Sequence, residues 1–235
     1  MPAEEAIVLV GGLGTRLRAV VSDVPKPLAP VAGRPFLAWL LDAYADAGLR
    51  RVILATGYLS ASIEQAIGRG WKGMEIAYSR EESALGTGGA IAQALAQVQG
   101  DGVHLANGDT FLRYAPAGLE AATPAAACGL GIALASVADV GRYGAVEAAG
   151  GRVTGFREKG GGGPGLINAG SYYLAGQAFD RLPAETAAWS FEERVLVPWS
   201  ARGEVAAFGQ TSDFIDIGVP DDYERAQALF AGRPA

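Results

Sequence analysis

The first 135 residues alternate between short apolar runs and longer stretches with apolar residues at helical spacing. The apolar runs are Ala6–Val10, Arg51–Ala55, Gly102–Ala106 and Gly129–Ala135. Such runs are typical of strands buried on both faces, as in parallel sheets. The helical patterns between the first of these runs are Pro35–Gly48, Ser60–Gly68 and Gly88–Gln99. This alternation predicts an α/β fold, a Rossmann-like three-layer α/β/α arrangement with a mostly parallel mixed central sheet.

The pattern changes after about residue 136. Shorter strands are predicted at Tyr143–Glu147, Arg152–Phe156, Ile167–Leu174 and Val205–Phe208, and the glycine loop Gly160–Gly165 separates two of them. Pro220–Phe230 predicts a closing helix, because a proline and acidic residues lie in its first turn. We expect a single domain, residues 1–235, whose two halves, about 1–135 and about 136–235, face one cleft.

Composition and charge narrow the function classes. The net charge is −6 and no block of Lys and Arg stands out, so a nucleic-acid surface is not expected. A single cysteine, Cys128, excludes an internal disulfide and a zinc cluster of several cysteines. The N-terminal residues lack the pattern of a signal peptide and no run is long enough to span a membrane. We therefore expect a cytoplasmic protein without a membrane partner, either a monomer or a homodimer.

A glycine loop follows the first predicted strand. It reads Gly11-Gly12-Leu13-Gly14-Thr15-Arg16-Leu17-Arg18, and Pro25-Lys26-Pro27 comes shortly after it. Bare backbone N–H groups after a buried strand can approach phosphates closely. The spacing fits neither the dinucleotide fingerprint nor the ATPase loop. The glycines alone are equally consistent with a tight turn, but with an arginine and a lysine fixed between two prolines they favour a triphosphate site.

A second glycine cluster, Leu85–Ala90, opens a predicted helix. Gly88 and Gly89 are poor helix formers, so something must require bare backbone there. A flat nucleotide base is one candidate, and an ordinary turn before a helix is the alternative.

Two aspartates stand out further along the chain. Asp109 follows a buried strand, where open α/β sheets bind ligands, and Asp216 lies among apolar residues. Two carboxylates near a triphosphate can hold Mg²⁺, although each alone is as consistent with a turn or cap. The only histidine, His104, lies within a strand, which favours a structural role.

The combination G-G-x-G-T-R-L-R with P-K-P resembles the signature of the sugar-1-phosphate nucleotidyltransferase family. Further similar elements, L-G-T-G, N-G-D, R-Y-G, E-K, N-A-G and D-x-G, extend the resemblance over nearly the whole chain. It implies a fold of the nucleotidyltransferase type with a nucleotide-binding first half and a sugar-binding second half. It also implies Mg²⁺-dependent transfer of a nucleoside monophosphate from a nucleoside triphosphate to a sugar 1-phosphate, with release of pyrophosphate.

The resemblance also assigns roles to individual residues. The catalytic residues would be Arg16, Lys26 and Asp109, and the metal ligands Asp109 and Asp216. The nucleotide-binding residues would be Leu9, Gly11, Gly12, Gly14, Thr15, Glu81, Gly86, Thr87, Gly88 and Asn107. The sugar-phosphate-binding residues would be Gly144, Glu158, Lys159, Asn168 and Gly170.

Within the family, the motifs most resemble the branch that uses GTP and D-glycero-α-D-manno-heptose 1-phosphate to make GDP-heptose for surface glycans. Gly12, where many relatives carry alanine, and the short tail after Asp216 favour this branch. Mannose-1-phosphate guanylyltransferases and N-acetylmuramate-1-phosphate uridylyltransferases remain alternatives, since no side chain reads guanine by itself. A catalytically silent nucleotide-sugar sensor is a further alternative, but such relatives usually lose the cationic or metal residues that this chain keeps.

Overall fold

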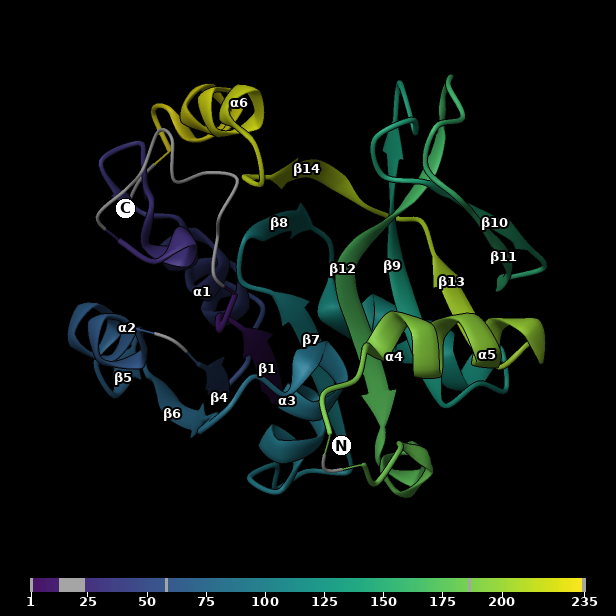
Figure 1. Ribbon diagram of the computed structural model, residues 1–235, viewed down its shortest axis with the longest axis horizontal. Coiled ribbons are helices and arrows are strands. Elements are labelled where there is room, and N and C mark those ends of the chain that lie inside the picture. The colour runs from purple at the N-terminus through teal and green to yellow at the C-terminus, as the bar shows by residue number, and fades with distance from the viewer. Residues whose placement is uncertain (1, 13–23, 58, 186, 234–235) are drawn as a thin grey trace.

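The computed structural model describes residues 2–12, 24–57, 59–185 and 187–233 (Figure 1). Its strands are β1 (Glu5–Leu9), β2 (Pro30–Val31), β3 (Arg34–Pro35), β4 (Arg51–Thr56), β5 (Gly70–Trp71), β6 (Met74–Arg80), β7 (Gly102–Asn107), β8 (Thr110–Arg113), β9 (Leu130–Val137), β10 (Ala145–Ala149), β11 (Arg152–Arg157), β12 (Gly165–Ala175), β13 (Val205–Phe208) and β14 (Ser212–Asp216). Its α-helices are α1 (Phe36–Asp46), α2 (Ser60–Ile67), α3 (Gly86–Leu95), α4 (Pro116–Ala125), α5 (Val197–Ala201) and α6 (Pro220–Phe230). The short helical turns are η1 (Lys26–Leu28), η2 (Gly176–Arg181) and η3 (Glu192–Leu196).

One ten-stranded sheet runs through the molecule, from β5 and β6 at the left of Figure 1 to β10 and β11 at the right. Its order is β10-β11-β13-β9-β12-β7-β1-β4-β6-β5. The strands β7, β1, β4 and β6 are parallel neighbours, and β9, β13 and β10 run in the same direction. Only β12, β11 and β5 run the opposite way. The predicted mostly parallel mixed sheet is confirmed, and it crosses both proposed halves without a break, while the division into halves stays a prediction.

Helices cover both faces of this sheet. Because side chains along each strand alternate between the faces, one strand packs against helices on both sides. In β1, Ala6 and Val8 pack in a cluster with α1 and α2, whereas Ile7 packs with α3. In β9, Ile132 packs on the face covered by α3 and α5, and Ala133 packs against α4 on the other face. The three-layer α/β/α prediction is therefore confirmed. None of the helices in the described ranges combines the length and apolar character needed to cross a membrane.

The closing helix α6 has the bounds that the sequence predicted and is fixed by one aromatic side chain. Phe230 is 1% exposed. Its ring stacks on Trp39 with centroids 4.7 Å apart, and it meets Phe36 and Phe111 edge-on at 6.2 Å and 5.0 Å. Because Ile215 belongs to the same cluster, this contact ties both α6 and β14 to α1.

We expect Phe230→Ala to lower the free energy of unfolding by about 3–5 kcal/mol, because it removes a buried aromatic ring and leaves a cavity. Urea denaturation followed by circular dichroism measures this. Leu59→Ala, at an exposed position, is the control and should change the stability by less than about 0.5 kcal/mol. Equal stability of the two variants would mean that α6 is not anchored by this cluster.

His104 lies fully buried in β7, with its ring 5.3 Å from that of Tyr173. Neither ring nitrogen has a hydrogen-bond partner among the described residues. Burial lowers the pKa of His104 from its ordinary value of 6.5 to about 4. The residue is a neutral part of the core, in agreement with the structural role expected from its place inside a strand.

This burial predicts a pH dependence of stability. Below pH 6.5 the unfolded chain protonates His104 while the folded protein does not, so stability falls as the pH falls through the window between 6.5 and about 4. Between pH 6.5 and pH 5 the loss should be about 1.5 kcal/mol. Urea denaturation at several pH values should show a flatter profile for His104→Leu than for the unaltered protein. Parallel profiles would contradict the assignment.

Candidate active site

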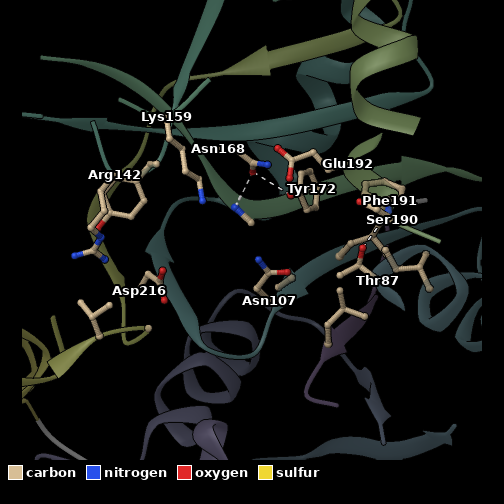
Figure 2. Close-up of a pocket in the computed structure, with 18 residues that line it drawn as sticks. Thr87, Asn107, Arg142, Lys159, Asn168, Tyr172, Ser190, Phe191, Glu192 and Asp216 are labelled. Atoms are coloured by element: carbon tan, nitrogen blue, oxygen red, sulfur yellow. Dashed lines mark hydrogen bonds between the residues drawn. The ribbon is translucent and has the colours of Figure 1, made fainter. Parts of the chain in front are cut away.

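A cavity of about 390 Å³ opens at the carboxyl ends of β1 and β7, a place and size typical of ligand sites in open α/β sheets (Figure 2). It is lined by Leu9, Thr87, Ile91, Leu105, Ala106, Asn107, Arg142, Tyr143, Lys159, Asn168, Gly170, Tyr172, Ser190, Phe191, Glu192, Asp216, Gly218 and Val219. Residues from both ranges, 1–135 and 136–235, contribute to this wall.

The two aspartates meet because β14 pairs with β8 outside the main sheet. In this antiparallel pair Asp216 lies opposite Thr110, the residue after Asp109. The backbone N–H of Ile217 donates to the carbonyl oxygen of Asp109 at 3.0 Å. The backbone thus brings together two carboxylates that are far apart in the sequence, while their role as metal ligands stays a prediction.

Lys26 lies between these carboxylates. Its Nζ is 2.5 Å from Oδ2 of Asp109 and 3.5 Å from Oδ1 of Asp216, and its side chain is only 11% exposed. Lys26 begins the single 3₁₀ turn η1, and Pro25 and Pro27 restrict the backbone on either side of it. The lysine is therefore held rigidly as the shared cation of a carboxylate pair.

Lys26 only partly offsets the burial and mutual repulsion of the two carboxylates. Burial, followed by the negative charge of Asp109, raises the pKa of Asp216, and Lys26 opposes the shift only in part. Oδ1 of Asp216 is buried and accepts no hydrogen bond from any described residue. An additional cation would satisfy both features. In the described part of the chain no group of three or more His, Cys, Asp or Glu is placed to hold a metal ion. Two carboxylate oxygens suit Mg²⁺, which commonly keeps water and phosphate oxygens as its other ligands, and the predicted Mg²⁺ site stays a prediction.

In the second glycine cluster the absence of side chains is explained by a contact within the protein, and not by the nucleotide base considered above. A Cβ on Gly88 would lie 1.9 Å from a ring carbon of Trp189, and one on Gly86 would lie 2.4 Å from the Trp189 carbonyl oxygen. Gly88 N–H donates to that oxygen at 3.0 Å, and Trp189 N–H donates to Leu85 at 2.9 Å. The flat group against the start of α3 is thus the indole of Trp189. Nucleotide binding by Gly86, Thr87 and Gly88 stays a prediction, with Thr87 at the cavity wall.

The first glycine loop is described only in part. Leu9 and Asn107 line the cavity at the ends of adjacent strands. A Cβ on Gly11 would lie 3.1 Å from Oε1 of Glu81, whose Oε2 accepts a hydrogen bond from Leu85 N–H at 2.8 Å. Glu81 therefore joins the two glycine loops. No described residue lies within 4 Å of where a Cβ on Gly12 would be. The predicted residues Gly14, Thr15 and Arg16 lie outside the described residues.

The predicted sugar-phosphate residues divide into two groups. Lys159, Asn168 and Gly170 line the cavity, and a Cβ on Gly170 would lie 2.4 Å from the amide nitrogen of Asn107. Glu158 is exposed and is not among the lining residues. A Cβ on Gly144 would lie 2.7 Å from a backbone carbonyl oxygen of the neighbouring strand β11, so its bare backbone already has a structural cause.

One wall of the cavity, the segment Ser190-Phe191-Glu192, could not be predicted from the sequence. Its pattern S-x-x-E resembles a helix capping signature, and Ser190 Oγ accepts a hydrogen bond from Glu193 N–H at 3.3 Å. That signal locates a helix start, but it contains nothing that places the segment at the cavity. Arg142 and Tyr143, which belong to the R-Y-G element, also line the cavity, and Arg142 pairs with Asp222 of α6.

Together, this sheet and its cavity define an α/β protein of the nucleotidyl transferase type. The family model described as Nucleotidyl transferase matches residues 5–232, and the chain belongs to this family. It is 39% identical over 223 residues to a D-glycero-alpha-D-manno-heptose 1-phosphate guanylyltransferase of Aneurinibacillus thermoaerophilus, covering 95% of this chain and 96% of that one. It is 37% identical to a mannose-1-phosphate guanylyltransferase of Mycobacterium tuberculosis, covering 95% of this chain and 64% of the relative.

A solved structure is similar throughout. The crystal structure of HddC from Yersinia pseudotuberculosis complexed with GMP-PN has a TM-score of 0.83 and 33% identity, covering 97% of this chain and 99% of that chain. The family resemblance seen in the sequence motifs is therefore confirmed.

The Trp189 contact yields a prediction for the second glycine cluster. Gly88→Ala should lower the free energy of unfolding by about 1–3 kcal/mol, because the added methyl group forces the indole to move. Gly209→Ala, where a Cβ meets nothing within 4 Å, should be close to neutral. In a Trp189→Ala background the Gly88→Ala cost should largely vanish. Thermal and urea unfolding measure all four variants, and an unchanged cost in that background would show that Trp189 is not the obstacle.

Proposed function

We propose that this chain transfers GMP from GTP to D-glycero-α-D-manno-heptose 1-phosphate, giving GDP-heptose and pyrophosphate. The observation that carries the proposal is the placement of Lys26 between Asp109 and Asp216 beside a cavity built from both halves. Membership of the nucleotidyl transferase family supports the reaction class. The relatives from Aneurinibacillus thermoaerophilus and Campylobacter jejuni, 39% and 36% identical, support GTP and the heptose phosphate, as does the GMP-PN bound to HddC.

The proposed reaction is an in-line displacement. A phosphate oxygen of the sugar 1-phosphate forms a bond to the α-phosphorus of GTP, while the bond between that phosphorus and the oxygen bridging to the β-phosphate breaks. Pyrophosphate leaves with the bonding electrons. The attacking phosphate monoester is already an anion at neutral pH, so no general base is needed. Catalysis then consists of positioning and of neutralising charge.

The cavity residues divide these tasks. Lys159 at the cavity wall provides a point charge for the sugar phosphate. Lys26, together with Arg16, would neutralise charge on the departing pyrophosphate. Asp109 and Asp216 would hold Mg²⁺, which when bound supplies charge to phosphate oxygens. Oδ1 of Asp216, which is buried and has the ion pair with Lys26 but no hydrogen bond to a described residue, supports this assignment.

A matrix of substrates tests the proposal. Pyrophosphate release is measured with each of four nucleoside triphosphates against heptose, mannose, glucose and N-acetylmuramate 1-phosphates. The proposal expects turnover to be greatest with GTP and the heptose phosphate. A preference for mannose 1-phosphate or for UTP would favour one of the two rival transferases. Nucleotide binding without turnover on any pair would favour the silent sensor.

We expect Asp109→Asn to lower kcat/KM by about a hundredfold to a thousandfold at saturating Mg²⁺, in the range seen when one electrostatic group is removed from an active site. Asp221→Asn, which changes an exposed aspartate in the first turn of α6, is the matched control and should leave turnover unchanged. Pyrophosphate release across a Mg²⁺ titration compares the two. Near-normal turnover of Asp109→Asn would rule out the metal assignment.

A further inference from the structure

Glu192 is placed at the cavity wall by an unusual local backbone. It is the first residue of η3, a single turn of π-helix, a feature that often marks functional sites. Glu192 and Asp216 are the only carboxylates among the described residues that line the cavity. Asp216 is engaged with Lys26, whereas no described residue forms an ion pair or side-chain hydrogen bond with Glu192. The cavity therefore contains one carboxylate that the proposed reaction does not use.

The backbone around Glu192 is anchored on both sides. Before it, the N–H of Phe191 donates to Oγ1 of Thr87 at 3.0 Å, and the buried ring of Phe191 meets that of Tyr172 edge-on at 5.4 Å. After it, the N–H of Val197 donates to the carbonyl oxygen of Glu192, closing the π turn. These contacts fix where the side chain of Glu192 starts on the wall.

Asn168 and Tyr172, which line the cavity with Glu192, complement it (Figure 2). Oδ1 of Asn168 accepts hydrogen bonds from Gly170 N–H at 2.9 Å and from the Tyr172 hydroxyl at 3.0 Å, so the Asn168 NH₂ group is left to donate into the cavity. Tyr172 and Glu192 line the same cavity (Figure 2). Burial raises the pKa of Tyr172, and the negative charge of Glu192 raises it further. The wall thus offers a neutral donor beside a charged acceptor.

The cavity is also polarised in charge. In Figure 2, Asn168 lies between Lys159 and Glu192. A phosphate is attracted to the cationic side at Lys159 and repelled from Glu192. Sugar hydroxyls both donate and accept, so they match a carboxylate beside an amide NH₂, and the charged acceptor makes those hydrogen bonds stronger.

We propose that Glu192 is a specificity-determining residue, which accepts hydrogen bonds from sugar hydroxyls remote from the phosphate and excludes sugar 1-phosphates that carry a carboxylate. This inference rests on the proposed function and deepens it. It selects neutral polyhydroxy sugars over acidic ones, and it disfavours N-acetylmuramate 1-phosphate, whose lactyl group is anionic.

Glu192→Gln tests the proposal because it keeps the size of the side chain and removes its charge. The matched control is Glu193→Gln, at the adjacent exposed residue, which does not line the cavity. For Glu192→Gln, KM for the preferred neutral sugar 1-phosphate should rise about tenfold to a hundredfold, because hydrogen bonds to a charged group are lost, while KM for GTP stays unchanged. Glu193→Gln should match the unaltered protein in both values.

A second measurement isolates the charge. With glucuronic acid 1-phosphate as the probe, the ratio of kcat/KM for acidic over neutral substrate should rise at least tenfold in Glu192→Gln and stay constant in Glu193→Gln. The inference about Glu192 is overturned if Glu192→Gln and Glu193→Gln have the same ratio of kcat/KM for acidic over neutral substrate and the same KM values for the sugar 1-phosphate and GTP. The proposed function stands in that case.

Calorimetry distinguishes a failure of the inference about Glu192 from a failure of the proposed function. Binding of heptose, mannose and glucose 1-phosphates is measured with a non-hydrolysable GTP analogue present, so turnover is not needed. Binding at least tenfold weaker in Glu192→Gln than in Glu193→Gln, with equal thermal unfolding of the two variants, supports the proposal even if the unaltered protein transfers no nucleotide. Equal binding, or no binding by the unaltered protein, overturns it.

Discussion

Two negative charges held close together beside a single lysine are the constraint around which this site is built. Asp109 and Asp216 would repel each other if they were merely close, and the raised pKa of Asp216 records that repulsion together with burial. What holds them is backbone hydrogen bonding between β8 and β14, not attraction between the side chains. Lys26, fixed between two prolines, then offsets part of the cost. The aromatic cluster around Phe230 is what keeps β14 in place.

Much of the fold could be predicted because its signals are local. Continuous apolar runs located β1, β4 and β7, and a proline with acidic residues located the start of α6. By contrast, the helix α4 is rich in alanine and lacks a clear apolar period, so no helix was predicted there. The pairing of β8 with β14 joins residues about a hundred positions apart, and no local pattern contains that information.

The site shows the same division between local and distant causes. Lys26 could be predicted because the prolines that fix it are its neighbours in the sequence. The sequence indicates that position 88 requires glycine. It does not indicate why, since the side chain that would clash, Trp189, lies a hundred residues away in the chain. Glu158 stood in a recognisable motif and yet lies outside the cavity lining, while Glu192 stood in none and lies in it. Motif position therefore located the backbone elements better than it located the side chains that face the cavity.

The pairing of β8 with β14 also has a consequence for how the protein is made. Synthesis proceeds from the N-terminus, so Asp109 leaves the ribosome about a hundred residues before Asp216, and Lys26 leaves it earlier still. The strands β1, β4 and β7, which carry the parallel core, are all complete by then. The second carboxylate can join the first only after β14 has emerged, and contacts of such long sequence separation form slowly. The charged centre of the site is therefore among the last features to be completed in each new chain.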